Sequence, residues 1–149
     1  MHDRRSSSVR DRRLYSFSDF HELVQAEKER SQRYKHFFII IGLIILSRSE
    51  QDTLGLLKTK LRLSDYAYTV DHEAGETMVN SYRVAILLPE TDLEGAKVVQ
   101  ERLMEMFMVH EFTLQMGQAA YPDDATISEK LIEKAFTSAL PVGLFQPVS

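Results

Sequence analysis

The sequence predicts an α/β chain, more narrowly an α+β sandwich of the ferredoxin-like kind, in which helices flank a central sheet. Three observations predict it. An isoleucine-rich apolar run suits a central strand that is covered on both faces. Two shorter strand patterns joined by a polar turn indicate an antiparallel hairpin in the middle of the chain. Helical and strand patterns alternate around that hairpin, so the expected order is βααββαβ after an N-terminal helix.

The N-terminal region divides into a tail and a helix. Residues 1–17 hold arginines and serines without apolar periodicity, so they are expected to form a disordered basic tail. Residues 18–35 are expected to form a linker or stalk helix, with Ser18 as its N-cap and Phe20 on a short apolar stripe. The rest of this helix is polar, which is typical of a helix that connects domains or packs only at one end. Such a helix could also mediate a homodimer.

The central strand is expected at Phe37–Leu46, which reads FFIIIGLIIL. A helix that crosses a bilayer needs about 20 apolar residues, and this run has half that number, so no membrane span is expected. Ser47 and Glu50 form a capping box for a helix that continues to about Arg62.

The expected hairpin joins Tyr66–Val70 and Tyr82–Leu88 through a polar turn at Asp71–Thr77. Gly117, in a later strand, can allow the close approach of another part of the backbone. The other expected elements of the domain at residues 36–141 are a helix capped by Asp92, a strand at Phe112–Ala119, and a helix that begins at a capping box of Thr126 and Glu129 and ends at Pro141, before a tail at residues 142–149.

Composition excludes several kinds of function. The chain has no cysteine, which excludes disulfides, thiolate metal sites and cysteine nucleophiles. Its net charge of −4 argues against nucleic-acid binding. No targeting signal is visible, so the expected location is the cytoplasm.

Four segments of the sequence resemble parts of a known family. Ala85–Asp92, AILLPETD, is similar to the strand and turn that directly follow the signature of GGDEF domains. Leu93–Phe107 is similar to the next helix, and Phe112–Pro122, FTLQMGQAAYP, to a later strand of these domains. Arg62–Asp65, RLSD, is similar to the segment before the signature hairpin. The resemblance covers roughly residues 30–140, and it implies the nucleotide-cyclase-like fold of the diguanylate cyclases.

The resemblance also implies that the catalytic signature is lost. In the family, the sequence Gly-Gly-Asp/Glu-Glu-Phe lies on the hairpin turn, where glycines admit guanosine triphosphate and a carboxylate binds Mg²⁺. Counted back from Ala85, these degenerate signature positions hold Asn80, Ser81, Tyr82, Arg83 and Val84. None of them is a glycine or a carboxylate, and an arginine brings positive charge where metal chemistry needs negative charge.

Other parts of the family's catalytic apparatus are missing as well. The family's metal-binding aspartate follows the first strand, and the corresponding stretch here, Ile41–Ile45, IGLII, has no oxygen-bearing side chain. The late phosphate-holding lysine is replaced near Leu140. The loop that reads the guanine base is shortened between Leu46 and Leu54. Because phosphoryl transfer depends on positioning and charge neutralisation, we expect no enzyme activity and no metal or other cofactor.

The polar turn offers one alternative. Asp71, His72, Glu73 and Glu76 could together hold a metal and support a residual nucleotide hydrolase. A solvated acidic turn is the preferred interpretation, because adjacent strand residues such as His72 and Glu73 point to opposite sides.

The resemblance implies that the family's product-binding, inhibitory site is retained. Arg62 and Asp65 match its Arg-x-x-Asp motif in spacing and place, and Arg102 stands where a further arginine comes from the following helix. Arginine can pair with guanine O6 and N7 or with phosphate, and an aspartate can accept from the guanine N1 and N2 edge. A pair at the end of a helix also has a purely structural explanation, since a cation there complements the helix dipole.

Two functions are therefore expected. The first is a catalytically inactive GGDEF-like domain that binds cyclic di-GMP through Arg62, Asp65 and Arg102 and relays the ligand state to an unknown protein partner. The alternative is a nucleotide-independent scaffold of the same fold for protein interaction or dimerisation.

Overall fold

The computed structural model describes residues 13–47, 55, 59, 66–74, 80–108 and 113–142. The elements within these residues are helix α2 (Phe17–Tyr34), strand β1 (Phe38–Ser47), β2 (Ala67–Ala74), β3 (Asn80–Leu88), α4 (Leu93–Met108), β4 (Thr113–Tyr121), α5 (Ser128–Thr137) and β5 (Leu140–Val142).

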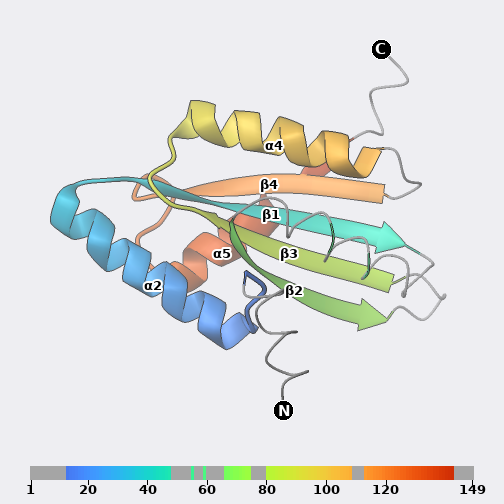
Figure 1. Cartoon of the computed structure of the whole chain (residues 1–149), viewed down its shortest axis with the longest axis horizontal. Coiled ribbons are helices and arrows are strands. Elements are labelled where there is room, and N and C mark those ends of the chain that lie inside the picture. The colour runs from blue at the N-terminus through green and yellow to red at the C-terminus, as the bar shows by residue number, and fades with distance from the viewer. Residues whose placement is uncertain are drawn as a thin grey trace.

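The strands form one sheet of five in the order β2-β3-β1-β4-β5, and every neighbouring pair is antiparallel (Figure 1). Its first four members follow the strand order of a ferredoxin-like sandwich, so the predicted fold class is confirmed. The isoleucine-rich strand β1 lies between β3 and β4 and is paired along its length with both. Its central position agrees with a run of apolar residues that is buried on both faces.

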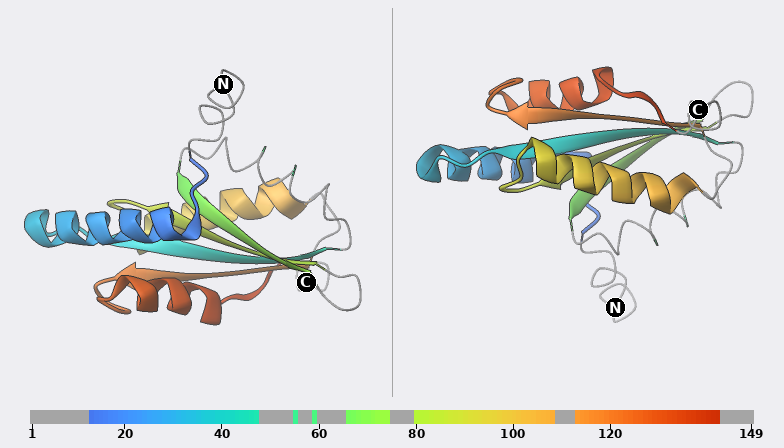
Figure 2. Two further views of the ribbon diagram at one scale, coloured as in Figure 1. Left: turned by 90° about the horizontal axis from the view of Figure 1, so that it is seen from below. Right: turned by 90° about the horizontal axis from the view of Figure 1, so that it is seen from above.

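Side chains of β1 point alternately into two hydrophobic cores, one on each face of the sheet. Ile39, Ile41 and Leu43 pack on the side of α4, while Phe38 and Ile40 pack on the side of α2 and α5. Figure 2 shows α4 and α5 on opposite faces of the sheet. The helices contribute Ala96, Val99 and Leu103 to the first core, and Phe20, Val24, Leu131, Ile132 and Ala135 to the second.

Helix α2 packs against the domain along most of its length. Besides Phe20 and Val24, it buries Glu27 and Ser31, and these four positions recur every three or four residues on one face. The expectation that this helix packs only at one end is wrong, because its buried stripe continues through polar residues that do not look like core. The N-cap is Ser16, whose hydroxyl accepts from the Asp19 N–H at 3.1 Å, and not Ser18.

The hairpin strands are longer than the sequence indicated. Asp71, His72 and Glu73 lie within β2 and are paired with β3, so the expected turn over Asp71–Thr77 is wrong at its beginning. The connection at residues 75–79, with Glu76, lies outside the described residues. Pairing with β3 extends the strand into polar sequence, which hydrophobic alternation alone does not mark.

The C-terminal elements confirm one cap and correct another. Asp92 caps α4, and its Oδ1 accepts from the Gly95 N–H at 2.8 Å. Helix α5 follows Ile127, whose side chain makes no capping hydrogen bond, so the expected capping box of Thr126 and Glu129 is wrong.

A short fifth strand was not expected. β5 pairs with β4 at the edge of the sheet, where its proline is tolerated because one side of an edge strand needs no partner. Of the helix expected from Ser47 to Arg62, only Gly55 and Thr59 are described, and both are helical. No helix within the described residues is long and apolar enough to cross a membrane.

Candidate functional site

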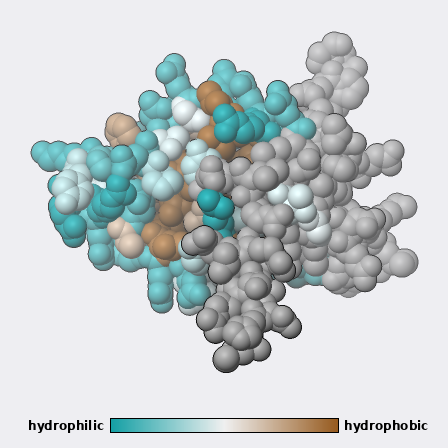
Figure 3. Space-filling model, in the orientation of Figure 1, coloured by the Kyte–Doolittle hydropathy of each residue, from teal (hydrophilic) through white to brown (hydrophobic). Residues whose placement is uncertain are grey.

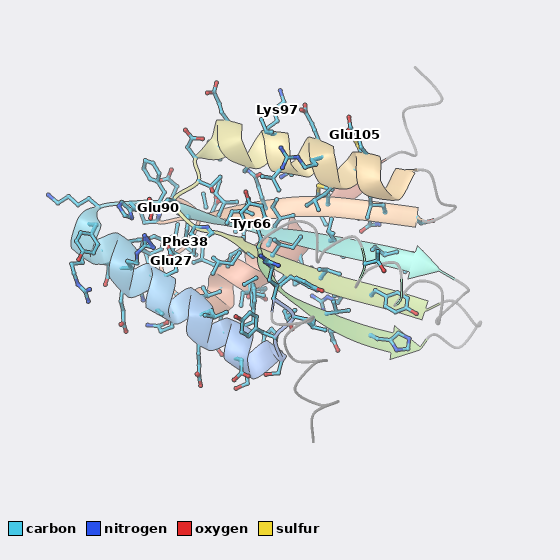
Figure 4. The ribbon with its side chains drawn as sticks, viewed as in Figure 1. Glu27, Phe38, Tyr66, Glu90, Lys97 and Glu105 are labelled. Carbon is cyan, nitrogen blue, oxygen red and sulfur yellow. The ribbon has the colours of Figure 1, made fainter. Side chains whose placement is uncertain are left out.

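Only one of the three residues predicted to bind cyclic di-GMP lies in the described part of the chain. Arg102 lies on α4, and its side chain is exposed. Figure 4 shows that Lys97 and Glu105, on the same helix, also project away from the sheet. Arg62 and Asp65 lie outside the described residues, so whether they meet Arg102 stays a prediction.

The five positions expected to be a degenerate signature all lie in strand β3. Tyr82, Arg83 and Val84 fall within the expected strand, whereas Asn80 and Ser81 belong to the strand and not to the turn before it. Tyr82 pairs in register with His72 of β2 and Ile45 of β1, well inside the sheet. Tyr82 and Val84 are completely buried in the core beneath α4, whereas Arg83 is exposed on the opposite face. The reason is the length of the hairpin, because β3 already begins at Asn80 and β2 continues to Ala74.

The stretch of β1 that the resemblance places at the family's metal-binding aspartate is also apolar. Ile41, Leu43 and Ile45 are completely buried, and no group of three or more His, Asp or Glu suited to a metal occurs in the part of the chain that is described. Leu140, at the place of the late lysine, lies in β5 and is 69% exposed.

A cavity of about 480 Å³ opens on the α5 side of the sheet, and we call it the α5 cavity. Four residues of its floor are two register pairs of the hairpin, Thr69 with Ala85 and Asp71 with Arg83. Because strand residues two apart share a face, all four side chains point to the same side of the sheet. The remaining lining residues are Phe17 from α2 and Glu129, Ile132, Glu133 and Phe136 from one face of α5.

Arg83 is held at this cavity by an aromatic ring. Its guanidinium carbon lies 4.5 Å from the ring centroid of Phe136, which is a cation–π arrangement. No ion pair joins Arg83 to Asp71, Glu129 or Glu133, although all four line the same cavity. Among the described residues, the lining of the cavity thus combines apolar side chains with three carboxylates and one cation.

A smaller hollow of about 330 Å³ lies at the start of α4. Its charged lining residues are Asp92, Glu94 and Asp123, and the Asp92 carboxylate is already engaged in capping α4. Phe37 and Leu93 at this hollow are each more than half exposed. Figure 3 shows hydrophobic surface gathered between α2 and α4 on the face turned to the viewer, bordered by hydrophilic side chains.

A partly buried polar cluster joins the second half of α2 to the turn before α4, where Glu27 and Glu90 lie (Figure 4). Arg30 bridges the carboxylates of Glu27 and Glu90, and Nδ1 of His36 lies 3.9 Å from Glu90 Oε2. Glu27 is only 7% exposed, and burial raises the pKa of its carboxyl; Arg30 opposes the rise and the Glu90 carboxylate adds to it. Within the described residues, Glu27 Oε2, Ser31 Oγ and His36 Nδ1 are buried without hydrogen-bond partners.

Sequence reasoning identified neither the α5 cavity nor this cluster. Two residues of the cavity stand out in the sequence for other reasons: Arg83 is a cation among the signature positions, and Asp71 belongs to the expected acidic turn. Glu129 and Glu133 were not recognised as its rim, because nothing local shows which strands α5 covers.

Comparison with known proteins identifies the fold. No family model and no curated protein matches the chain. Among solved structures, a DGC (diguanylate cyclase) protein from Thermotoga maritima matches with a TM-score of 0.65 and 14% sequence identity. The match covers 85% of this chain and 96% of that one, so the two share a fold over nearly the whole domain.

Proposed function

We propose that this GGDEF-like domain has no cyclase activity and binds cyclic di-GMP through Arg62, Asp65 and Arg102, passing the ligand state to a protein partner. The shared fold with a diguanylate cyclase protein supports the general placement. The Arg-x-x-Asp spacing and its position just before β2, which begins at Ala67, support the ligand site.

The observation that carries the proposal is a contrast between two surfaces. At the catalytic places, Tyr82 and Val84 are core residues, and Ile41–Ile45 offers no side-chain oxygen to Mg²⁺, which binds oxygen in near-ideal octahedral geometry. At the product-binding place, Arg102 remains exposed on α4. Loss of the first set together with an exposed Arg102 favours a receptor over an enzyme.

The chemistry of the proposed ligand set suits a doubly anionic guanine dinucleotide. The planar fork of an arginine can grip guanine O6 and N7, stack on a purine or hold a phosphate with two hydrogen bonds. Lysine does not reproduce these geometries, so the site should distinguish between the two cations.

Isothermal titration of the purified protein with cyclic di-GMP tests the receptor. We expect binding by the unchanged protein and about a fivefold loss or more in Arg62→Ala and in Arg102→Ala, since a bidentate arginine contact contributes about 1–3 kcal/mol. Lys97→Ala on the same helix is the matched control and should bind as the unchanged protein does. Absence of heat at tens of micromolar ligand, or equal binding by Arg62→Ala, would refute the receptor.

A turnover assay tests the absence of catalysis separately. Guanosine triphosphate with Mg²⁺ or Mn²⁺ should give neither cyclic di-GMP nor a hydrolysis product. Product that disappears on unfolding the protein would show that the domain is an enzyme, whatever the titration shows.

The scaffold alternative receives less support from α2. A dimerising stalk needs a free apolar stripe, but this helix turns Phe20 and Val24 into the domain core. Its outward stripe includes Glu22, Ala26 and Glu29. If α2 mediates a homodimer, Ala26→Arg should convert the dimer to a monomer in sedimentation velocity. If the unchanged protein is itself a monomer, dimerisation through α2 is excluded.

A further inference from the structure

The polar cluster between α2 and α4 has no part in the proposed cyclic di-GMP site. It consists of Glu27, Arg30 and Ser31 of α2, His36 from the connection to β1 and Glu90 from the turn before α4, and we call it the α2–α4 junction. Arg30 and His36 both contact Glu90, which lies 60 residues after Arg30 in the sequence. The junction therefore joins the second half of α2, residues 27–34, to the turn that leads into α4.

Three polar atoms of the junction are buried and lack hydrogen-bond partners among the described residues. They are Glu27 Oε2, Ser31 Oγ and His36 Nδ1. Glu27 and Ser31 stand one helical turn apart, and the His36 N–H donates to the Ser31 carbonyl at 3.1 Å, so the three side chains are neighbours. Native proteins satisfy nearly all buried polar groups. Three exceptions in one place indicate a site with acceptor atoms that are available for a further hydrogen.

The fixed charges of the junction do not balance. Glu27 and Glu90 supply two carboxylates, and Arg30, which bridges them, supplies one permanent cation. His36 adds an imidazole, whose Nδ1 lies 3.9 Å from Glu90 Oε2. One added proton, on a carboxyl or on the imidazole, makes the cluster neutral. Because interacting groups titrate together, that proton belongs to the cluster and not to a single residue.

Burial makes a negative charge costly at Glu27. This residue is 7% exposed, and its burial raises the pKa of the carboxyl. The Arg30 cation lowers that pKa, the Glu90 carboxylate raises it and His36 lowers it, so charged groups act on Glu27 from α2, from the turn before α4 and from the connection to β1. A proton on Glu27 Oε2 also creates an O–H donor, for which Ser31 Oγ and His36 Nδ1 are unused acceptors.

A proton suits the junction better than a metal ion does. In the described part of the chain, no group of three or more His, Asp or Glu is suited to a metal. Among the described lining residues of the α5 cavity and of the hollow at the start of α4, Glu27, Ser31 and His36 do not occur. A proton needs no cavity and, unlike a metal ion, turns a carboxylate into a hydrogen-bond donor.

The turn on the other side of the junction has a strained backbone. Glu90 has a φ of 50°, in the left-handed region that residues other than glycine rarely adopt. Such conformations persist where surrounding contacts enforce them, and switch regions are among the places where they cluster. The contacts of Arg30 and His36 with Glu90 are suited to this role. Their loss would let the turn relax and would release the second half of α2.

We propose that the α2–α4 junction is a proton-operated latch. Uptake of one proton neutralises the cluster, supplies a donor to Ser31 or His36 and holds the second half of α2 against the turn before α4. Loss of that proton leaves two carboxylates against one cation and loosens the same contact. Helix α2 is thus held most firmly at acidic pH and released as pH rises. This proposal does not rest on cyclic di-GMP binding and stands if that binding is absent.

Amide hydrogen exchange of the full chain, measured by NMR at a series of pH values above 4.5, tests the latch. After correction for the intrinsic rate of each amide, exchange gives the equilibrium for local opening. Residues 27–34 should open more readily as pH rises, by up to about tenfold per pH unit, which is the limit for one proton. They should also open more readily than β1. No pH dependence, or opening of α2 only together with β1, would overturn the latch.

Two carboxyl variants show whether Glu27 carries this effect. The pH dependence of opening should be lost in Glu27→Gln, because its side chain stays neutral. It should remain in the control Glu29→Gln, which changes an exposed carboxyl of the same helix. An unchanged pH dependence in Glu27→Gln would contradict the proposal.

Two variants that break the same ion pair should act in opposite directions. Glu90→Gln removes a carboxylate, so Glu27 should release its proton at lower pH, whereas Arg30→Gln removes the cation, so Glu27 should release it at higher pH. Arg30 and Glu90 are nearly half exposed, so both variants should keep the fold. The carboxyl carbon signal of Glu27, followed by NMR through a pH titration, measures both midpoints. Shifts of the same sign would show a merely structural bridge and would overturn the latch.

Discussion

Gly42 of β1 and Gly117 of β4 are register partners, and both lie directly beneath the Ala135 carbonyl of α5. A Cβ added at Gly42 would come within 2.8 Å of that oxygen, and one added at Gly117 within 2.6 Å. The adjacent Ser138 hydroxyl accepts from the Gln118 N–H at 3.2 Å, which ties the end of α5 to β4. Because the two glycines have no side chains, α5 can lie close to the sheet at this point.

Gly117→Ala should destabilise the domain by about 1–3 kcal/mol, the usual cost of overpacking. The added methyl would meet the backbone atoms of Ala135, Ser138 and Ala139 between 2.6 and 2.7 Å, and backbone cannot rotate away as a side chain can. Urea unfolding followed by circular dichroism measures the change.

Gly55→Ala is the matched control for this prediction. Gly55 is helical, and a Cβ there would meet nothing within 4 Å, so the substitution should be neutral or stabilising by up to about 1 kcal/mol. Equal destabilisation by both substitutions would mean that α5 does not sit on Gly117.

Ser16→Ala should cost about 0.5–2 kcal/mol, because it removes the hydroxyl that accepts from the Asp19 N–H at the start of α2. Ser18→Ala, two residues later and exposed, should change stability by less than about 0.5 kcal/mol. Thermal unfolding of the pair distinguishes the observed cap from the one that the sequence suggested; the reverse order of effects would contradict the helix start at Phe17.

A carboxylate placed at position 82 of β3 should unfold the domain and give no cyclase activity. Tyr82 is completely buried, and its ring stacks on His72 with 4.7 Å between centroids. Tyr82→Glu should cost at least about 3–5 kcal/mol, since it removes a large core ring and buries a charge. Arg83→Gln, its exposed neighbour, should cost about 1 kcal/mol at most through the lost cation–π contact. A folded, active Tyr82→Glu protein would refute the placement of these positions in the core.

Glu27 should make stability fall as pH rises. Burial raises the pKa of this carboxyl above its ordinary value of 4.5, so the folded state holds the proton more tightly than the unfolded state. From about pH 4.5 upward, loss of the proton favours unfolding until the raised pKa is passed. Glu27→Gln stays neutral, so its stability relative to the unchanged protein should increase across this window and then level off.

Urea unfolding at a series of pH values measures that difference, and Glu29→Gln is its control. Glu29 lies on the exposed side of the same helix. A pH-independent difference for Glu27→Gln, parallel to that of Glu29→Gln, would show that the Glu27 carboxyl is not perturbed.

Regular apolar patterns predicted most elements correctly. The run Phe37–Leu46 identified the central strand, and the spacing of Ala96, Val99 and Leu103 identified the buried face of α4. Predictions failed where polar residues take part in ordered structure. Ser31 and Glu27 extend the buried stripe of α2, and pairing with β3 draws Asp71 and His72 into a strand.

The sequence by itself determined the fold class, the close approach at Gly117 and the absence of carboxylates from Asn80–Val84, because each depends on residue type at local spacing. The tertiary structure alone decided what surrounds those positions. Sheet register places Tyr82 in the core and Arg83 beside Asp71. The packing of α5 against Gly42 and Gly117 brings Glu129 and Glu133 to the same cavity as these strand residues. Contacts between segments far apart in the chain arise from packing and leave no periodic signal in the sequence.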